Sequence, residues 1–240
     1  MESLEAELDR ARDLDTAALA DAIETIGFEC TRCGACCKAV EGCESEDEDR
    51  EDEGESGDAK PDAEGHEHTA TVFPDEIRRL QETGDYDWRD VARPTPFGLT
   101  DGPDGPEGET FEWALGIDDC GDCTFYAEDE AGGACTVHAD RPLVCRTYPF
   151  SVALGGTSQP LGEAVDEEGM VRAHECEGLG RNISREEAEE LATALKERAV
   201  RELEEAIDVR DNYEPVDTDS GEVVVHDSEG AKWPDGRPVE

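Results

Sequence analysis

Apolar residues recur at helical spacing near the start of the chain. Within residues 2–12 their spacing predicts an amphipathic helix, and a second short helix is predicted from Asp15 or Thr16, with Gly27 directly after its last turn. The residues that these helices turn inward are Leu4, Leu8, Ala11, Leu19, Ile23 and Ile26. Residues 1–27 are therefore predicted to form two N-terminal helices, each with one buried face.

The clearest helical pattern lies nearer the C-terminus. Ser184 and Glu187 have the spacing of a capping box, in which each side chain accepts a hydrogen bond from the other residue's backbone. The apolar stripe that follows consists of Ala188, Leu191, Leu195, Ala199, Leu203 and Ile207. We expect a long C-terminal helix within residues 179–210. Its stripe is typical of core packing, and a dimer seam is the alternative.

Patterns between these helices are shorter. Pro74 suits the first turn of a helix whose inward residues are Ile77 and Leu80. Short strands are predicted at residues 110–117 and 151–156. These elements add a small amount of sheet to the predicted helices.

The remaining segments lack periodicity. Residues 93–109 carry four prolines and four glycines and predict a loop. Residues 41–68 hold fourteen acidic residues and predict a disordered acidic insertion. Residues 211–240 predict an acidic tail with at most one short strand, at 223–225. Taken together, the patterns indicate a small, loop-rich α+β fold.

Composition adds a second constraint. Apolar residues make up 36% of the chain, below the roughly 45–50% of a typical globular domain. A core of this size usually needs a metal, disulfides or a partner to stay folded. The 65 acidic and 21 basic residues give a net charge of -44, and the resulting self-repulsion is screened only at high salt. This surface is typical of a halophilic, haloarchaeal type of protein and disfavours nucleic acid and anionic membranes as partners.

The ten cysteines offer the candidate chemistry. The N-terminus has neither the basic nor the apolar region of a secretory signal, and no apolar run approaches the length of a membrane span. We therefore expect a cytoplasmic protein, in which clustered cysteines are metal ligands more often than disulfides. A disulfide set and inert buried cysteines are the alternatives.

The first cysteine group is compact. Cys30, Cys33 and Cys36 are separated by two residues each, a spacing that brings sulfurs onto one metal and matches the first three positions of a bacterial ferredoxin run. Cys37 follows directly. In an extended segment, adjacent side chains point to opposite sides, so the pair predicts either two neighbouring sites or a multi-iron cluster with a spare thiol.

The second group comprises Cys120, Cys123, Cys135, Cys145 and Cys176. The whole set allows two four-sulfur sites with two cysteines left over. Cys43 borders the acidic insertion, and its role and that of Cys120 are left open.

Three segments together, CTRCGACC, TVFPDEIRRL and ACTVHADRPLVCRTYPF, resemble the YkgJ-like cysteine-cluster family, a zinc- or iron-chelating CxxCxxCC domain. The likeness runs from Phe28 to Gly178. The resemblance implies a metal-organised domain over 28–178 and excludes Cys43 and Cys120 from the pattern. The ligands that it implies are Cys30, Cys33, Cys36, Cys37, Cys123, Cys135, Cys145 and Cys176.

Other residues near the cysteines have weaker expectations. His138 and His174 are candidate ligands, with packing or hydrogen bonding to a ligand favoured for His138, and His66 and His68 are expected in a solvated loop. Arg141 and Arg146 either hydrogen-bond thiolates or form a surface pair. Two aromatic residues are expected to pack on the cluster and exclude water, and two prolines to fix its loop: Tyr148, Phe150, Pro142 and Pro149.

The leading hypothesis is a binding protein in which zinc or iron, mononuclear or as an iron–sulfur cluster, organises the domain. An iron–sulfur enzyme is the main alternative, because the flagellin lysine methylase has a similar cysteine motif associated with such a cluster. No glycine-rich nucleotide loop follows a strand, which weakens that alternative. A passive metal store is the third hypothesis.

Overall fold

A computed structural model describes residues 3–39, 68–103, 105–129, 132–154, 164–166 and 169–239, and the statements below concern these ranges. The helical elements are α1 (Leu4–Arg12), α2 (Thr16–Ile26), η1 (Ala35–Cys37), α3 (Pro74–Gln81), α4 (Trp88–Val91), η2 (His138–Asp140), α5 (Leu143–Thr147) and α6 (Arg185–Asn212). The strands are β1 (Thr71–Val72), β2 (Ala92–Pro94), β3 (Thr100–Gly102), β4 (Gly105–Thr110), β5 (Trp113–Leu115), β6 (Tyr126–Asp129), β7 (Gly132–Cys135), β8 (Phe150–Val152), β9 (Ala164–Asp166), β10 (Val171–His174), β11 (Val223–Asp227) and β12 (Gly230–Lys232). The expected α+β class is confirmed.

The N-terminal helices form as their sequence predicts. The Asp15 carboxylate accepts hydrogen bonds from the backbone of Ala17 and Ala18, which caps α2. Gly27 ends α2 with a φ of 78°, and a Cβ at this position would lie 2.5 Å from the Arg181 carbonyl oxygen. Only glycine satisfies both the left-handed backbone and the close approach.

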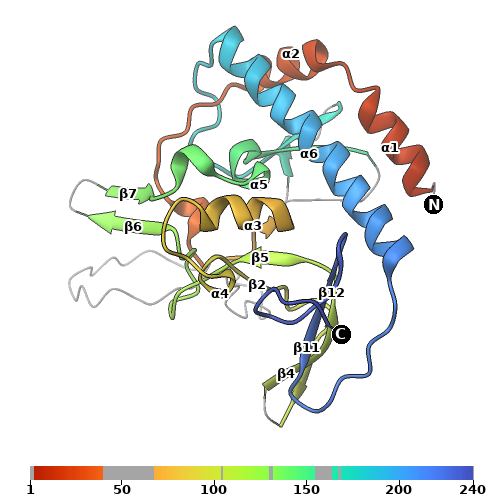
Figure 1. Ribbon diagram of the computed structural model, residues 1–240. Coiled ribbons are helices and arrows are strands. Elements are labelled where there is room, and N and C mark those ends of the chain that lie inside the picture. Colours follow the sequence, from red (N-terminus) through yellow and green to blue (C-terminus); the bar gives the residue numbers. More distant parts are fainter. Residues whose placement is uncertain are drawn as a thin grey trace, which may run out of the picture.

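The long helix α6 organises the first hydrophobic core. The Ser184–Glu187 capping box is present, and the predicted stripe packs inward, so the core interpretation of the stripe is confirmed. In Figure 1 helices α1 and α2 lie along α6, and strands β8 and β10 contact α6 and α2, respectively. The buried residues of this first core are Leu8, Ala11, Leu14, Leu19, Ala20, Ile23, Phe150, Val152, Leu154, Val171, Ala173, Ala188, Ala192, Leu195, Ala199 and Leu203.

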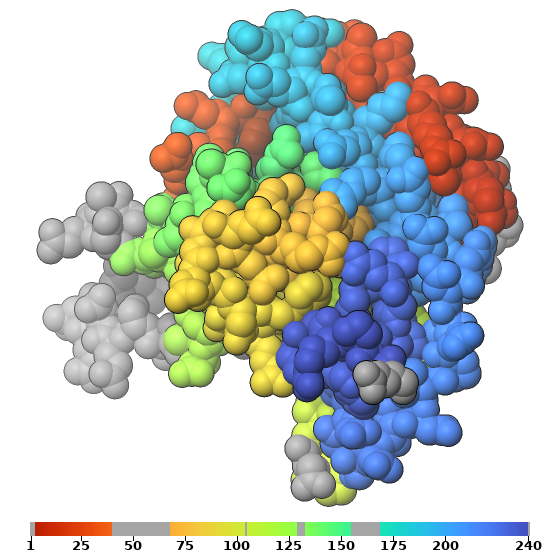
Figure 2. Space-filling view, viewed as in Figure 1, coloured from red at the N-terminus to blue at the C-terminus, as the bar shows by residue number. Residues whose placement is uncertain are grey.

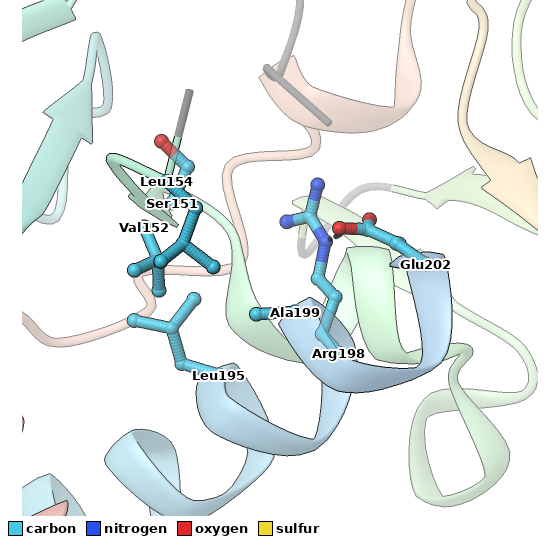
Figure 3. A pocket seen from close by; sticks show the side chains of 7 residues that line it. All are labelled: Ser151, Val152, Leu154, Leu195, Arg198, Ala199 and Glu202. Atoms are coloured by element: carbon cyan, nitrogen blue, oxygen red, sulfur yellow. Dashed lines mark hydrogen bonds and ion pairs between the residues drawn. The ribbon is translucent and has the colours of Figure 1, made fainter. Parts of the chain in front are cut away.

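A buried arginine ties α6 to the short helix α5. The Arg198 guanidinium donates to the Thr147 hydroxyl at 3.0 Å and to the Glu202 carboxylate at 2.7 Å. Figure 3 shows Arg198 and Glu202 projecting from α6 toward each other beside Ser151. Because α5 carries Cys145, this contact links the first core to one of the predicted ligands.

A second core lies under the short strands of the middle of the chain. The sheet β1-β5-β2 packs against α3, whose residues Ile77 and Leu80 are buried as predicted. The buried residues of this second core are Ala70, Val72, Ile77, Leu80, Val91, Ala92, Trp113, Leu115, Cys123, Phe125, Val137 and Val225. It lies on the opposite side of α5 from α1 and α2 (Figure 1).

Two predictions about irregular segments are wrong. Residues 93–109, expected as a loop, contain β3, most of β4 and the end of β2. Residues 211–240 contain two strands, β11 and β12, where at most one was expected. Strand β11 pairs in parallel with β4, Val223 opposite Gly108, so each segment finds its partner more than a hundred residues away. Local pattern cannot reveal such a pairing.

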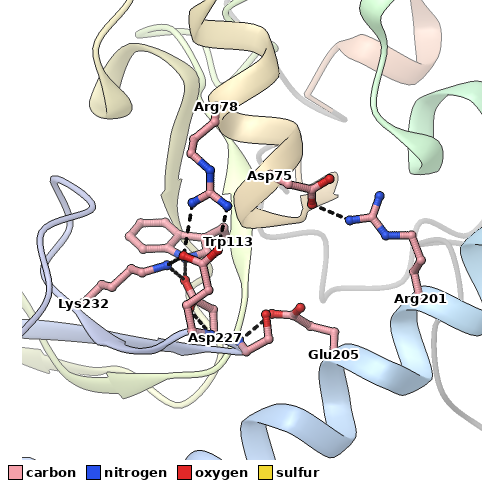
Figure 4. Close-up of polar contacts among 9 residues, drawn as sticks. Asp75, Arg78, Trp113, Arg201, Glu205, Asp227 and Lys232 are labelled. Carbon is pink, nitrogen blue, oxygen red and sulfur yellow. Dashed lines mark hydrogen bonds and ion pairs between the residues drawn. The ribbon is translucent and has the colours of Figure 1, made fainter.

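The C-terminal strands are anchored by a buried polar network. The Trp113 indole donates to Asp227 at 2.8 Å, and the Lys232 ammonium donates to the same carboxylate at 2.7 Å. Figure 4 shows these groups together with the adjacent Arg78 of α3. In the space-filling view, the C-terminal strands (dark blue) form one continuous surface with residues of α3 and α4 (yellow) (Figure 2). Strands β11 and β12 are therefore part of the surface of the second core.

Within the described ranges, every helix is too short or too polar to span a bilayer.

Candidate metal centre

The CxxCxxCC segment forms a tight loop directly after α2. Arg32 and Gly34 both have a positive φ, 58° and 77°, and the Cys37 amide donates to the Gly34 carbonyl at 2.7 Å. Cys30, Cys33 and Cys36 are exposed on this loop. The turn therefore leaves these three residues accessible to solvent.

The adjacent pair departs from the sequence-based expectation. Cys36 and Cys37 lie in a 3-10 turn, not in an extended segment, and their Sγ atoms are 3.9 Å apart. Two ligands on a tetrahedral zinc, with Zn–S bonds of about 2.3 Å, are separated by ~3.8 Å. The premise that the two side chains point to opposite sides is wrong, because the turn swings both sulfurs toward one region.

The loop rests on the β6–β7 hairpin. A Cβ at Gly34 would lie 2.3 Å from the Tyr126 ring, and the Lys38 ammonium lies 5.1 Å from the centroid of that ring. Lys38 also pairs with Glu128 at 2.6 Å. These contacts dock the cysteine loop against the strand that faces Cys135.

Backbone hydrogen bonds bring the distal cysteines to this loop. The Cys123 amide donates to the Cys37 carbonyl at 2.8 Å, which joins the two cysteine groups directly. On the other side, the Glu29 amide donates to the Gly178 carbonyl at 3.0 Å, and the Gly178 amide contacts the Cys176 sulfur at 3.4 Å. Segments far apart in sequence therefore meet on both sides of the loop.

The thiols act on one another electrostatically. The hydrogen bond with Cys37 lowers the pKa of Cys36 to about 7, while the same bond and burial raise the pKa of Cys37. Burial is also the main reason that the pKa of Cys123 rises to about 11. The charge of Cys36 contributes to the raised pKa of the thiols at Cys37, Cys123, Cys135, Cys145 and Cys176. In the metal-free protein most of these thiols stay protonated at neutral pH, so metal binding must release protons.

Arg141 is the cation that acts most broadly on the cysteines. Burial raises the pKa of Cys135 and Cys145, and the Arg141 guanidinium opposes both shifts. Its charge also contributes to the low pKa of Cys36. Arg146 is exposed on α5. Of the two arginines, Arg141 is therefore the better candidate to offset thiolate charge.

The two predicted aromatic neighbours behave differently. Burial, followed by the charges of Cys176 and Cys36, raises the pKa of Tyr148 to about 12, which places this ring beside the cysteines. Its hydroxyl donates to the Glu175 carbonyl at 2.5 Å. Phe150 instead packs edge-on against Phe28 in the first core. The expectation that Phe150 covers the cluster is wrong, because β8 directs it toward α6.

The histidines also fall into different environments. His68 was expected in a solvated loop, yet it is buried, and burial is the main reason that its pKa falls to about 4. His138 is exposed on η2. The buried His174 ring contacts the Ser151 hydroxyl at 3.1 Å. His66 lies outside the described residues.

A buried glutamate that sequence analysis missed supports the site. The Glu76 carboxylate accepts hydrogen bonds from the amides of Leu143, at 2.9 Å, and Phe73, at 3.3 Å. It therefore fixes the start of α5, two residues before Cys145, against α3. Its position three residues after the helix cap is the one sequence feature that could have indicated it.

Eight of the cysteines are free thiols, and they are the eight that the family pattern implies. Cys120 is disulfide-bonded, and Cys43 lies outside the described residues. Within the described ranges, no three His, Cys, Asp or Glu side chains stand in a complete ligating arrangement. The donor set nevertheless fits a thiophilic metal in number and chemistry, because zinc and iron both take four cysteine sulfurs.

Comparison with known proteins agrees with this donor set. Residues 29–177 match the family model CxxCxxCC, described as a zinc- or iron-chelating domain. No curated protein and no solved structure matches the chain. The match covers more than half of the sequence and contains all eight free cysteines, so the chain belongs to the CxxCxxCC family.

Proposed function

We propose that the eight free cysteines bind zinc or iron and that the bound metal holds together the region between the two hydrophobic cores. The observation that carries the proposal is the backbone contact between the two cysteine groups, Cys123 to Cys37 at 2.8 Å. Residues 86 positions apart would gain little from such a contact without a further interaction at the same place.

The chemistry of the surroundings supports the proposal. Several thiols that raise one another's pKa form an unfavourable site for multiple negative charges in the absence of a cation. A bound metal ion supplies positive charge and a crosslink between the thiolates. Arg141 offsets part of the remaining charge, and Tyr148 limits access of water on the side of Cys176.

The energetics favour a structural role. Structural zinc contributes ~10–16 kcal/mol in small domains, which is comparable with the ~5–15 kcal/mol stability of a whole protein. The strands around the cysteines are two to six residues long, so they bury little apolar surface by themselves. Metal binding would therefore supply a large part of the stability of this region.

Metal content after anaerobic purification tests the proposal. The work belongs in concentrated salt, because a chain with a net charge of -44 repels itself in dilute buffer. We expect stoichiometric zinc or iron in the native chain, little in Cys33→Ser, and an unchanged amount in the control His138→Ala, which removes an exposed neighbour. Visible absorption typical of iron–sulfur proteins would select a cluster, and a colourless zinc protein would select mononuclear sites. A folded chain without metal would contradict the proposal.

A further inference from the structure

The loop that ends at Cys123 holds the end of the CxxCxxCC segment in place. The Cys123 amide donates to the Cys37 carbonyl at 2.8 Å. One residue earlier in the same loop, the Asp122 carboxylate accepts a hydrogen bond from the Ala39 amide at 2.7 Å. Two adjacent residues of the loop therefore bind backbone groups two residues apart in the cysteine segment. Only the second of these contacts depends on a side chain.

A further contact joins this loop to the chain at His68. The Gly121 carbonyl accepts from the His68 amide at 2.9 Å, and the Arg93 guanidinium donates to the His68 carbonyl at 3.0 Å. The His68 ring is buried and contacts the backbone of Cys36. The segment that ends at Ala39 and the segment that begins at His68 are therefore both fixed to this one loop.

The loop has internal hydrogen bonds that fix the backbone of Asp122. The Asp118 carboxylate accepts from the amides of Cys120, at 2.8 Å, and Asp122, at 3.1 Å. The Asp118 amide donates to the Asp122 carbonyl at 2.8 Å. An aspartate side chain that bonds to the backbone shortly after it is a common way to stabilise a turn. Because the Asp122 amide and carbonyl are both bonded, the positions open to its carboxylate are limited.

The Asp122 contact acts on the relative position of two predicted ligands. Ala39 lies two residues after Cys37, and Asp122 lies directly before Cys123, so a shift at this contact moves one cysteine relative to the other. A hydrogen bond to an ionised carboxylate is also stronger than one between neutral groups. Residues that hold metal ligands in place typically contribute about 10- to 100-fold to metal affinity.

We propose that Asp122 is a positioning residue for metal binding: its carboxylate fixes the segment after Cys37 against the loop that carries Cys123, and so keeps these two cysteines next to each other. This inference rests on the proposed function, because it requires both cysteines to bind metal. It makes no assignment of the other thiols to a centre.

Zinc affinity of the full chain, measured anaerobically in concentrated salt by competition with a chelator, tests this role. Asp122→Ala removes the acceptor and should weaken zinc binding by about 10- to 100-fold. Asp122→Asn keeps an oxygen that accepts from the Ala39 amide but carries no charge, so it should restore most of the native affinity. The matched control is Asp119→Ala, which removes an exposed carboxylate from the same loop and should bind zinc as the native chain does.

Two conditions keep the comparison clean. Cys120 belongs to the same loop and is disulfide-bonded, so a phosphine reductant is present throughout and the loop is held without that bond. Circular dichroism of the zinc-saturated variants shows whether each is folded. If Asp122→Ala is unfolded even with zinc, Asp122→Asn decides alone: near-native affinity supports the inference, and a large loss overturns it.

The asparagine variant separates positioning from the other roles of a carboxylate. If Asp122 attracted cations or bound the metal itself, Asp122→Asn would lose as much affinity as Asp122→Ala. That result, native affinity in Asp122→Ala or an equal loss in Asp119→Ala would overturn this inference while leaving the proposed function intact. A native chain that binds neither zinc nor iron would overturn the proposed function itself.

Discussion

The two hydrophobic cores of this protein are built in different ways. The first core depends on ordinary helix signals: side-chain caps on α1, α2 and α6 and an apolar stripe along α6. The second core is assembled from short strands, the helices α3 and α4 and cysteine side chains, and, like the first core, it joins segments more than a hundred residues apart. The comparison teaches that strong local signals specify the helices of the first core, whereas the short elements of the second core have fewer such signals and gain more from a crosslink that a metal can supply.

Removing the metal should give the largest difference in stability between the two cores. We expect a loss of roughly 10 kcal/mol of stabilisation from the second core, because its thiols lose their crosslink. Amide hydrogen exchange should then become fast in β5, β6 and β7 while α6 stays protected. Equal loss of protection in both cores would contradict the comparison, and reloading with zinc should restore the native pattern.

A cavity in the first core should lower the stability of the chain without lowering the amount of bound metal. Leu195 is 1% exposed, so Leu195→Ala is expected to lower the free energy of unfolding by about 2–5 kcal/mol. Chemical denaturation of the metal-loaded chain measures this change. The amount of bound metal should remain that of the native chain, and a parallel loss of metal would show that the cores are not independent.

A substitution in the cysteine loop should give a smaller, more local effect. Gly34→Ala adds a Cβ that would lie 2.3 Å from the Tyr126 ring, at a φ of 77°. We expect a cost of about 1–3 kcal/mol, and weaker metal binding as the loop moves off the hairpin. The matched control is Gly180→Ala, with a φ of 74° and nothing within 4 Å of the added atom. Competition with a chelator measures affinity in both variants, and equal effects would exclude the docking contact as the cause.

The smallest expected effect is the pH dependence of stability that Glu229 causes at the surface of the second core. The Arg78 guanidinium, helped by Lys232, lowers the pKa of Glu229 to about 2. A lowered pKa adds stability above the ordinary glutamate value of 4.5, and this stability is lost as pH falls toward 2. The Glu229 side chain is 43% exposed, so solvent screening reduces the contribution to about 1 kcal/mol.

Denaturation of Glu229→Gln at pH 6 and at pH 3 tests this contribution. The stability difference from the native chain should be largest at pH 6 and shrink by pH 3. Glu214→Gln, which removes an exposed carboxylate, serves as the control for net charge. A difference that grows on acidification would contradict the assignment.

The sequence was informative where interactions are local. The cap at Ser184, the glycine after α2 and the start of α3 at Pro74 were all predicted within a few residues, because each involves neighbours along the chain. The cysteine spacing also indicated the family that the comparison establishes.

Long-range contacts could not be predicted in the same way. Strand β4 was expected as a loop because its glycines and prolines disfavour a strand, yet β11 supplies its partner. His68 ends a highly acidic segment, and only the fold shows that it is buried. The Cys36–Cys37 geometry depended on a turn that requires a left-handed glycine, which spacing alone does not specify. Which thiols share a metal stays a prediction for the same reason.

The most direct test of the account is the stability of the second core with and without metal. Matched samples of the full chain, loaded with zinc or iron and stripped by a chelator, can be compared by hydrogen exchange of the Cys123–Cys145 segment in concentrated salt. The account predicts strong protection of this segment in the loaded chain and its loss in the stripped chain. Equal protection in the two samples would contradict the claim that metal holds this region together.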